Sequence, residues 1–537
     1  MLDNDPKVLE AYSRDASIFK VMPKYVAFPK DTDDIKKLVK YAKENGESLT
    51  IRAAGTDMTG GPLNESIIVD VTKHMNGIGE IQARPSNSLL GLACITVQPG
   101  AYYRDFEKKT LEKGLLLPCY PASKDICALG GMVANNCGGE KSLRYGKMEN
   151  FIVESKWIFA DGNEYLIKPG VIDNEYSKQI YELIIKNYEL IRNAKPQVSK
   201  NSAGYYLWNA WDGKTFDLNK LLVGSQGTLG IMTEATVRLV KVKPKHDMVA
   251  LFFKSWDELP RVVNAILPFE PESLETFDEE TLKLGIRFMP EIAKRAGSGL
   301  ISFALKFLPE AWIGARMGGL PKLIVLVEVS EETEAEVKDK VRKISEAVKP
   351  FNVWSRVTEK DSEEEKFWVM RRESFNLLRK HVAPARHGFA VGKSGGDKRT
   401  APFIEDFCIP AERVPEFLPR AKKILEDNGI NVNIAGHAGE GNFHIIPLMD
   451  LSQESEREKI PRVAGLFYDL VAEYKGTITG EHNDGIIRTQ FLNKMYSPEI
   501  LELFKKVKQI FDPDNIFNPG KKVGGTIEYL KSHISRT

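Results

Sequence analysis

Long apolar runs, paired cysteines and an excess of charge of either sign are all missing from this sequence. The chain has 75 Lys plus Arg against 74 Asp plus Glu, a formal net charge of +1, so it has no bulk attraction for nucleic acid or an anionic membrane. No run of about 18 apolar residues occurs, so we expect no membrane span. Asp3 and Asp5 stand near the start without an apolar core after them, so we expect no signal peptide.

Cysteine is scarce, and its positions exclude the common cysteine frameworks. The five cysteines are Cys94, Cys119, Cys127, Cys137 and Cys408, and none forms a C-x-x-C pair. Such scattered thiols indicate a reducing compartment, no disulfide framework and no iron–sulfur cluster in this chain. A length of 537 residues predicts two or three globular domains with sizeable cores.

Histidine is also rare, and three of its eight occurrences lie in two short glycine-framed motifs. Residues 432–437 and 442–449 read as two strands of a hairpin joined by the turn at 438–441. Because side chains alternate faces along a strand, this register places His437 and His444 on the same side, diagonal to one another.

Two neutral imidazoles on one face are a metal-ligand pair that lacks a carboxylate. The second motif, Gly480-Glu481-His482-Asn483-Asp484-Gly485, offers Glu481 for that role. The alternative is that histidines at a hairpin end are hydrogen-bonding surface groups. We favour a metal or catalytic role, because so few histidines are concentrated in these motifs.

Three glycine-rich segments lie in the first half, at 53–61, 129–139 and 224–230. The first follows a strand in a βαβ pattern, where a loop of small residues can present backbone N–H groups to a phosphate. We expect the second to be a loop and the third to be a turn after a strand at 221–223. Tight loops that pack on themselves are the alternative, but their recurrence favours a cofactor groove. The nicotinamide fingerprint G-x-G-x-x-G is missing.

The pattern changes after Lys243-Pro244-Lys245, which reads as a linker. Strand-like and helix-like stretches alternate from 249 to 348 and predict a small antiparallel sheet with helices on one face. An irregular insertion spans 298–319. A helix beginning at Phe367 carries Arg371 and Arg372, which are either a solvated face or, near a buried site, a clamp for a carboxylate.

Together these motifs resemble the FAD-linked oxidases of the vanillyl-alcohol-oxidase (PCMH-type) superfamily, and more narrowly the D-lactate, glycolate and D-2-hydroxyglutarate dehydrogenases. The motifs are those at 53–61, 129–139, Gly224-Ser225-Gln226-Gly227-Thr228-Leu229-Gly230, 437–444, Glu481-His482 and Asn518-Pro519-Gly520-Lys521. The resemblance covers nearly the whole chain. It implies an α+β fold with a two-subdomain FAD-binding domain over 1–243, an antiparallel-sheet (ferredoxin-like) cap with the metal site over 244–490, and a C-terminal segment, 491–537, that packs back on the FAD domain.

The resemblance also implies a set of site residues. His437, His444 and Glu481 would bind a divalent Zn, Mn or Fe, His482 would act as the base, and Arg371 or Arg372 would fix the substrate carboxylate. No histidine lies in the first two glycine segments, so we expect noncovalent FAD. The residues expected to contact FAD are Ala54, Gly55, Thr56, Asp57, Met58, Thr59, Gly60, Pro121, Ser123, Gly130, Gly131, Ala134, Asn135, Gly138, Gly139, Gly227, Ile231 and Asn518.

Two departures from the family pattern bear on specificity. Gln226 replaces the usual Glu of the third glycine motif, which puts an ionic role there in doubt. Ile404 stands where the resemblance implies the Lys of 2-hydroxyglutarate enzymes, so it offers no cation for a second substrate carboxylate.

The implied activity is oxidation of a D-2-hydroxy acid to the 2-keto acid. The Gly-Glu-His-Asn-Asp-Gly-Ile-Ile-Arg form is similar to the flavin half of fused bacterial enzymes, whose iron–sulfur half this sequence lacks. A separate electron acceptor is therefore expected: an electron-transfer flavoprotein, an iron–sulfur subunit or a quinone. We expect a cytoplasmic protein or one peripheral to the membrane, with a homodimer as one assembly. The alternatives are a flavoenzyme acting on another alcohol, a metal-dependent hydrolase using the same His/Glu set, and a non-catalytic flavin-binding subunit.

Overall fold

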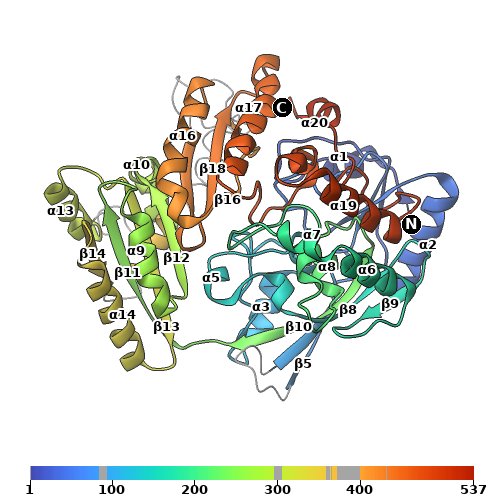
Figure 1. Ribbon diagram of the computed structural model, residues 1–537, viewed down its shortest axis with the longest axis horizontal. Helices are drawn as coiled ribbons and strands as arrows, with labels where there is room; N and C mark the ends of the chain where they lie inside the picture. The colour runs from blue at the N-terminus through green and yellow to red at the C-terminus, as the bar shows by residue number, and fades with distance from the viewer. Residues whose placement is uncertain are drawn as a thin grey trace. The chain divides into compact units, whose positions relative to one another are not determined.

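The structure is a computed structural model that describes residues 2–83, 93–295, 305–358, 363–364, 366–371, 399–430 and 432–536. The chain divides into two compact units (Figure 1). Unit 1 consists of Met1–Gln197, Asn201–Val242 and Thr477–Ser535, and unit 2 consists of Val198–Lys200, Lys243–Gly476 and Arg536–Thr537. The domain boundaries expected at 243/244 and 490/491 stay a prediction.

Unit 1 contains a four-stranded sheet with the order β1-β2-β4-β3, in which β2, β4 and β3 run parallel. These strands are β1 (Leu2–Asp3), β2 (Tyr25–Ala27), β3 (Leu49–Arg52) and β4 (Ile67–Asp70). The helix α2 (Thr32–Asn45) connects β2 to β3 and ends at Gly46, whose φ of 65° is the left-handed conformation that closes many helices. Its apolar stripe, at helical spacing, packs on this sheet: Ile35, Leu38, Val39 and Ala42.

A second, antiparallel sheet of unit 1 has the order β5-β6-β10-β8-β9, and β7 pairs with β10. Its strands are β5 (Ile78–Ala83), β6 (Ala93–Val97), β7 (Leu115–Leu116), β8 (Ile152–Ile158), β9 (Glu164–Ile167) and β10 (Ile231–Lys241). The helices of unit 1 before residue 242 are α1 (Pro6–Tyr12), α2, α3 (Tyr103–Leu111), α4 (Leu129–Asn135), α5 (Ser142–Tyr145), α6 (Glu175–Lys186), α7 (Tyr188–Asn193) and α8 (Asn219–Leu222).

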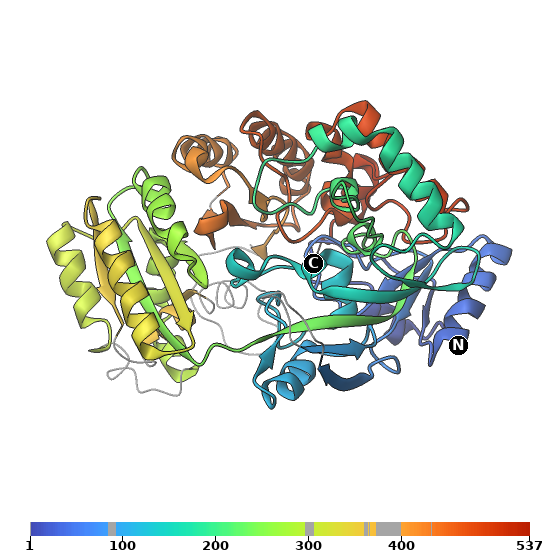
Figure 2. The same ribbon diagram turned by 60° about the horizontal axis from the view of Figure 1, so that its bottom comes forward.

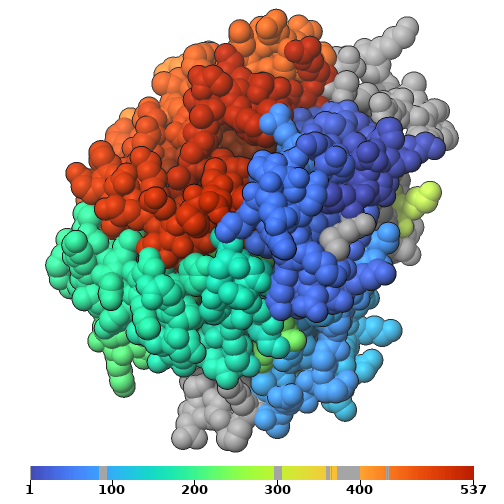
Figure 3. Space-filling view, turned by 90° about the vertical axis from the view of Figure 1, so that its right-hand side faces the viewer, coloured from blue at the N-terminus to red at the C-terminus, as the bar shows by residue number. Residues whose placement is uncertain are grey.

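The C-terminal stretch of unit 1 lies against its N-terminal sheet. The backbone N–H of Leu49 donates to the carbonyl of Ile516 over 2.7 Å, and that of Asn518 donates to the carbonyl of Leu49 over 2.9 Å. This stretch carries α18 (Gly485–Arg488), α19 (Pro498–Phe511) and α20 (Ile527–His533). Figure 3 shows these red residues beside the blue N-terminal residues and the teal residues of α6 and α7.

Unit 2 is built on an eight-stranded antiparallel sheet with the order β14-β11-β13-β12-β17-β18-β15, and β16 pairs with β18. Its strands are β11 (Lys245–Phe253), β12 (Ser273–Asp278), β13 (Leu323–Glu331), β14 (Val353–Val357), β15 (Arg399–Thr400), β16 (Phe407–Cys408), β17 (Val432–His437) and β18 (Asn442–Met449). Within the described residues its helices are α9 (Leu259–Ile266), α10 (Glu279–Arg287), α11 (Met289–Arg295), α13 (Leu308–Met317), α14 (Glu334–Val348), α16 (Val414–Asp427) and α17 (Glu454–Glu473).

Helices cover both faces of this sheet, so the prediction of helices on one face was wrong. On one face Ile313 of α13 packs with Met248, Ala250 and Phe252 of β11. The alternating residues Val249 and Leu251 are equally buried, and α14 lies along the strands there (Figure 2). Because both faces of β11 are covered, its residues from 248 to 253 are uniformly apolar.

Three other local predictions were also wrong. The expected loop at 129–139 begins with the helix α4, and the expected strand at 221–223 overlaps the short helix α8. The insertion at 298–319 contains the helix α13 within its described part. No helix within the described ranges is both long enough and apolar enough to span a bilayer.

Candidate functional site

The three glycine-rich segments of unit 1 meet through direct hydrogen bonds. Nδ2 of Asn135, from α4, donates to Oδ1 of Asp57 over 2.9 Å. The backbone N–H of Gln226 donates to the carbonyl of Ala134 over 2.9 Å, and its Nε2 donates to Oδ1 of Asn135 over 3.3 Å. Segments separated by about 170 residues of sequence therefore form one continuous lining.

The motif at 480–485 lies directly against these segments, within the same unit. The backbone N–H of Gly485 donates to Oε1 of Gln226 over 2.9 Å, and Nδ2 of Asn483 donates to the carbonyl of Gly224 over 2.9 Å. Gly485 has φ of 51°, and a Cβ there would lie 2.2 Å from Oγ1 of Thr59, so only glycine fits this contact. The side-chain amide of Gln226 thus accepts a hydrogen bond from Gly485 and donates one to Asn135, so it connects the motif to the second glycine segment.

The carboxylate of Glu481 belongs to this lining. A Cβ added at Gly138 would lie 3.2 Å from its Oε1, so the carboxylate borders the second glycine segment. The side chain is 7% exposed, and Nζ of Lys147 anchors the motif by donating to the carbonyl of Gly480 over 2.8 Å. His482, the expected base, follows in the same unit and is half-buried.

Asn518 ties the C-terminal stretch to two of the glycine segments. Its Nδ2 donates to the carbonyls of Gly61 (3.0 Å) and Gln226 (2.7 Å), and its Oδ1 accepts from the hydroxyl of Thr50 over 2.9 Å. All three hydrogen bonds of the Asn518 amide are thus made to protein groups. They fix the distance between the first and third glycine segments.

The lining has the character that a large polar cofactor requires. Residues 53–58, 130–131 and 134–135 are half-exposed, and apart from Met58 they are small or polar. Nδ2 of Asn136 and Oγ of Ser225 are buried and have no hydrogen-bond partner among the residues that the structure describes. Orphaned polar atoms at such a lining fit a hydrogen-bonding ligand such as a dinucleotide.

The remaining expected FAD residues occupy varied surroundings. Ile231 is fully buried in the core beside the first sheet, where it pairs with Ile158 of β8. A Cβ at Gly139 would lie 2.0 Å from the carbonyl oxygen of Tyr120, which makes that glycine a close-packing requirement. Pro121 and Ser123 are half-buried in the loop that follows Tyr120. Gly227, in the third glycine segment, has a φ of 65°.

In unit 2 the predicted hairpin forms with the predicted register. β17 and β18 pair so that His437 faces Asn442 and Ala435 faces His444. The two imidazole centroids lie 5.4 Å apart, with an angle of 87° between the ring planes.

Both imidazoles are held through Nδ1. Nδ1 of His437 lies 2.6 Å from Oε1 of Glu275, and Nδ1 of His444 lies 3.1 Å from the backbone carbonyl of Glu405. A carboxylate and a carbonyl only accept hydrogen bonds, so Nδ1 carries the proton in each neutral ring and the lone pair is on Nε2. Two neutral imidazoles, each oriented by an oxygen acceptor, are the donor set of a divalent metal site.

Glu275 was missed by the sequence interpretation. It lies on β12 directly opposite His437 of β17, and its second oxygen forms an ion pair with Nη2 of Arg371. Burial alone would raise the pKa of this carboxyl, but Arg371 and then His437 bring the pKa below its ordinary value. The available signal was a charged residue inside an otherwise buried strand.

A second buried ion pair supports the turn of the hairpin. Nζ of Lys200 lies 2.6 Å from Oε2 of Glu440, and both side chains are almost inaccessible. The thiol of Cys408 donates to the carbonyl of Glu440 over 3.1 Å. The turn between the two histidine strands is therefore fixed by charge and hydrogen bonding.

The predicted site residues are distributed over both units. Glu481 and His482 belong to unit 1, and His437, His444 and Arg371 belong to unit 2. Arg372 lies outside the described residues.

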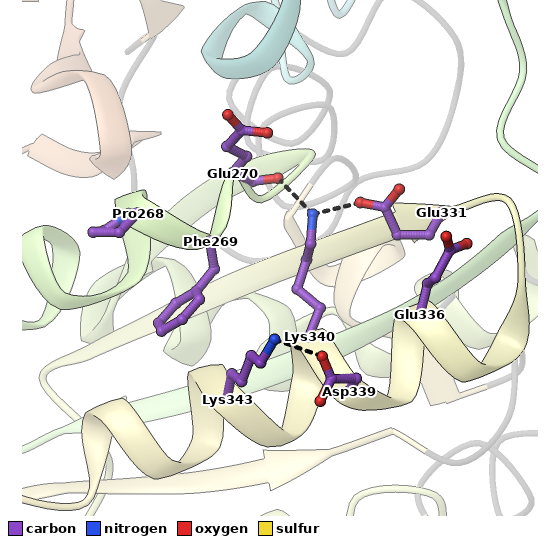
Figure 4. A pocket seen from close by; sticks show the side chains of 8 residues that line it. All are labelled: Pro268, Phe269, Glu270, Glu331, Glu336, Asp339, Lys340 and Lys343. Carbon is purple, nitrogen blue, oxygen red and sulfur yellow. Dashed lines mark hydrogen bonds and ion pairs between the residues drawn. The ribbon is translucent and has the colours of Figure 1, made fainter.

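A surface hollow in unit 2 is unrelated to these residues (Figure 4). It is lined by Pro268, Phe269, Glu270, Glu331, Glu336, Asp339, Lys340 and Lys343. Nζ of Lys340 forms an ion pair with Glu331, and Nζ of Lys343 lies 2.7 Å from Oδ2 of Asp339. The lysines of the hollow are thus already paired with its own acidic groups.

Comparison with known proteins identifies two family regions. Residues 243–522 match the model described as FAD linked oxidases, C-terminal domain, and residues 23–166 match the FAD binding domain model. The D-2-hydroxyglutarate dehydrogenase of Escherichia coli (strain K12) is 26% identical over 95% of this chain and 49% of its own length. The chain thus spans about half the length of that curated relative.

Two further similarities cover most of both chains. The glycolate oxidase subunit GlcD of Bacillus subtilis (strain 168) is 28% identical over 95% of this chain and 91% of its own. The solved structure of 4-ethylphenol oxidase from Gulosibacter chungangensis superposes with a TM-score of 0.64 at 15% identity, covering 98% of this chain and 95% of the other. The predicted α+β, PCMH-type fold is confirmed.

Proposed function

Because the chain belongs to the FAD linked oxidases, we propose that it oxidises a D-2-hydroxy acid to the corresponding 2-keto acid. The observation that carries this proposal is the packing of the 480–485 motif, with Glu481 and His482, on the first and third glycine segments within unit 1. This packing brings a candidate base next to the lining that fits a dinucleotide.

We assign the cofactor to the lining of unit 1. The glycine segments would hold FAD noncovalently through their backbone N–H groups and the orphaned amide of Asn136. FAD, when bound, supplies the redox chemistry by accepting the substrate α-hydrogen as a hydride.

His482 would remove the hydroxyl proton, since an imidazole has its reference pKa close to neutral pH. We assign His437, His444 and Glu481 as ligands of a divalent Zn, Mn or Fe, which when bound lowers the pKa of the substrate hydroxyl. The orientation of both imidazoles through Nδ1 supports this assignment.

Arg371 would bind the substrate carboxylate, and Arg372 is the second candidate. Nε of Arg371 is buried and has no hydrogen-bond acceptor in the described parts of the chain, although Nη2 is paired with Glu275. A guanidinium whose Nε has no acceptor among the described residues is suited to hydrogen-bonding a carboxylate.

The substrate is proposed to carry one carboxylate, as D-lactate and glycolate do. Ile404 is fully buried and supplies no cation for a second carboxylate. The buried Glu405 has a carboxylate oxygen within 4.8 Å of a ring nitrogen of His444, and its charge would repel another anion. Electrons would then pass to a separate acceptor: an electron-transfer flavoprotein, an iron–sulfur subunit or a quinone.

The visible spectrum of the purified protein tests the proposal. Flavin bands are expected, and they should bleach on anaerobic addition of D-lactate or glycolate, more slowly with D-2-hydroxyglutarate, and not with L-lactate. Flavin bands that persist with all of these acids would contradict the substrate class. A protein that takes up no FAD would contradict the cofactor assignment and favour a hydrolase using the same His/Glu set.

A further inference from the structure

A buried triad in unit 2 is centred on Glu275, a residue to which no role was assigned from the sequence. Its Oε1 lies 2.6 Å from Nδ1 of His437, and its Oε2 forms an ion pair with Nη2 of Arg371. The carboxylate is 1% exposed, so both contacts are made away from solvent. One carboxylate thus contacts both a candidate metal ligand and the candidate binder of the substrate.

The position of Glu275 follows from sheet register. β12 and β17 are antiparallel neighbours in which Glu275 and His437 are direct partners, followed by Thr276 with Gly436. Cβ atoms of such partners lie about 4.5–5.5 Å apart, which suits a carboxylate bonded to an imidazole. A Cβ at Gly436 would lie 2.3 Å from the carbonyl oxygen of Asn442, so β17 and β18 are also closely fitted.

We propose that Glu275 is a positioning residue that keeps the proton of His437 on Nδ1, the lone pair on Nε2 and the guanidinium of Arg371 beside it. A carboxylate only accepts hydrogen bonds, so it permits one tautomer of the neutral imidazole. This inference rests on the proposed role of His437 as a metal ligand. Partners of this kind commonly contribute 10–100-fold to metal affinity.

The test compares Zn²⁺ affinity of the FAD-loaded 537-residue chain and its Glu275→Gln variant, by competition with a chromophoric chelator. Gln has nearly the same shape as Glu, but its amide can donate a hydrogen bond to Nδ1 as well as accept one. The variant therefore also permits the tautomer of His437 that carries its proton on Nε2. We expect a roughly 10–100-fold weaker Zn²⁺ affinity, changed visible bands of the Co²⁺-substituted protein, and unchanged FAD content. A merely structural role would leave the Co²⁺ bands as they are.

Glu364→Gln is the matched control. Glu364 is a buried carboxylate of the same unit whose Oε2 lies 3.4 Å from Nε2 of His246, and it has no role in the proposed chemistry. Its replacement should leave Zn²⁺ affinity unchanged. A charge-neutral double variant, Glu275→Met with Arg371→Met, covers the case in which Glu275→Gln does not fold, because it leaves no buried charge unpaired. It should show the same loss of Zn²⁺ affinity.

The outcomes separate this inference from the proposed function. Equal Zn²⁺ affinity and identical Co²⁺ bands in the wild type and the Glu275 variants would overturn the inference alone. A wild-type protein that binds neither metal would overturn the proposed metal role and the inference with it. Loss of affinity in Glu364→Gln as large as in Glu275→Gln would also overturn it, since the effect would then be general.

Discussion

Lys522 and Asp484 form an ion pair to which solvent has no access. Nζ lies 3.0 Å from Oδ2, and both side chains are 0% exposed. The same ammonium donates to the carbonyls of Ser202 (2.9 Å) and Gly204 (2.7 Å), and Oδ2 accepts from the N–H of Gly204. Asp484 belongs to the motif of Glu481 and His482, so this pair fixes the motif to Lys522 and to the backbone at Ser202 and Gly204.

Lys522→Met should destabilise the protein by about 3–5 kcal/mol, because it leaves the Asp484 carboxylate buried and unpaired. Chemical denaturation followed by flavin fluorescence measures the change. Lys283→Met, at an exposed ion pair with Glu280, is the control and should leave the midpoint unmoved. A midpoint that is equally unaffected in Lys522→Met would show that the pair is dispensable.

His482→Ala should retain FAD and metal but lose turnover by about 10²–10⁴-fold, the usual contribution of a general base. Anaerobic reduction of the flavin by D-lactate measures the step directly. His74→Ala, at an exposed histidine of the same unit, should behave as the wild type. Near-normal flavin reduction in His482→Ala would remove this residue as the base.

Removing the metal with a chelator should abolish turnover without bleaching the flavin, because FAD and the metal are held by different residues. Adding back Zn²⁺ or Mn²⁺ should restore the rate, and His444→Ala should not be restored. Metal analysis of the treated sample must accompany the assay. Full activity in a sample verified to be metal-free would refute the role of the metal.

The carboxyl of Asp15 should make stability depend on pH. Burial, and then the Asp57 carboxylate, raise the pKa of Asp15 to about 7, and its Oδ2 accepts from the N–H of Gly60 over 3.1 Å. The folded chain therefore holds a proton that the unfolded chain releases near pH 4. The resulting stabilisation is complete below about pH 4 and is lost as the pH rises to about 7.

Asp15→Asn mimics the protonated acid and should remove this part of the pH dependence. The measurement is the free energy of unfolding at several values between about pH 4 and 7, where the wild type should lose on the order of a few kcal/mol. The variant should show a flatter profile over the same range. Parallel profiles for the two proteins would mean that Asp15 does not titrate there.

The His hairpin could be predicted from sequence because its information is local. A period of two and a glycine-rich turn set the register of β17 and β18, and the structure has that register. The contact between Glu275 and His437 spans 162 residues and depends on the sheet order β12-β17, which no local pattern contains.

The helix α4 is a case in which the local sequence predicts the wrong secondary structure. Two glycines in its first turn give it a poor intrinsic propensity, and an isolated chain would favour a loop. Tertiary contacts decide the outcome: Gly130 packs against Pro99, where an added Cβ would lie 2.7 Å from the carbonyl oxygen. The small residues of α4 allow close packing, but in the sequence they indicate a loop. The segment still lines the expected groove, as a helix rather than a loop.

The stretches that make up unit 1 are separated along the chain by most of unit 2. On the ribosome, synthesis proceeds at roughly 5–20 residues per second, so about 290 residues emerge between Gln226 and the Asn518 that donates to its carbonyl. During that interval the glycine segments of the nascent chain lack the hydrogen bonds from Asn518. The neighbouring motif also lacks the Asp484–Lys522 ion pair. The complete set of contacts around the glycine segments can therefore form only after the C-terminal stretch has been translated.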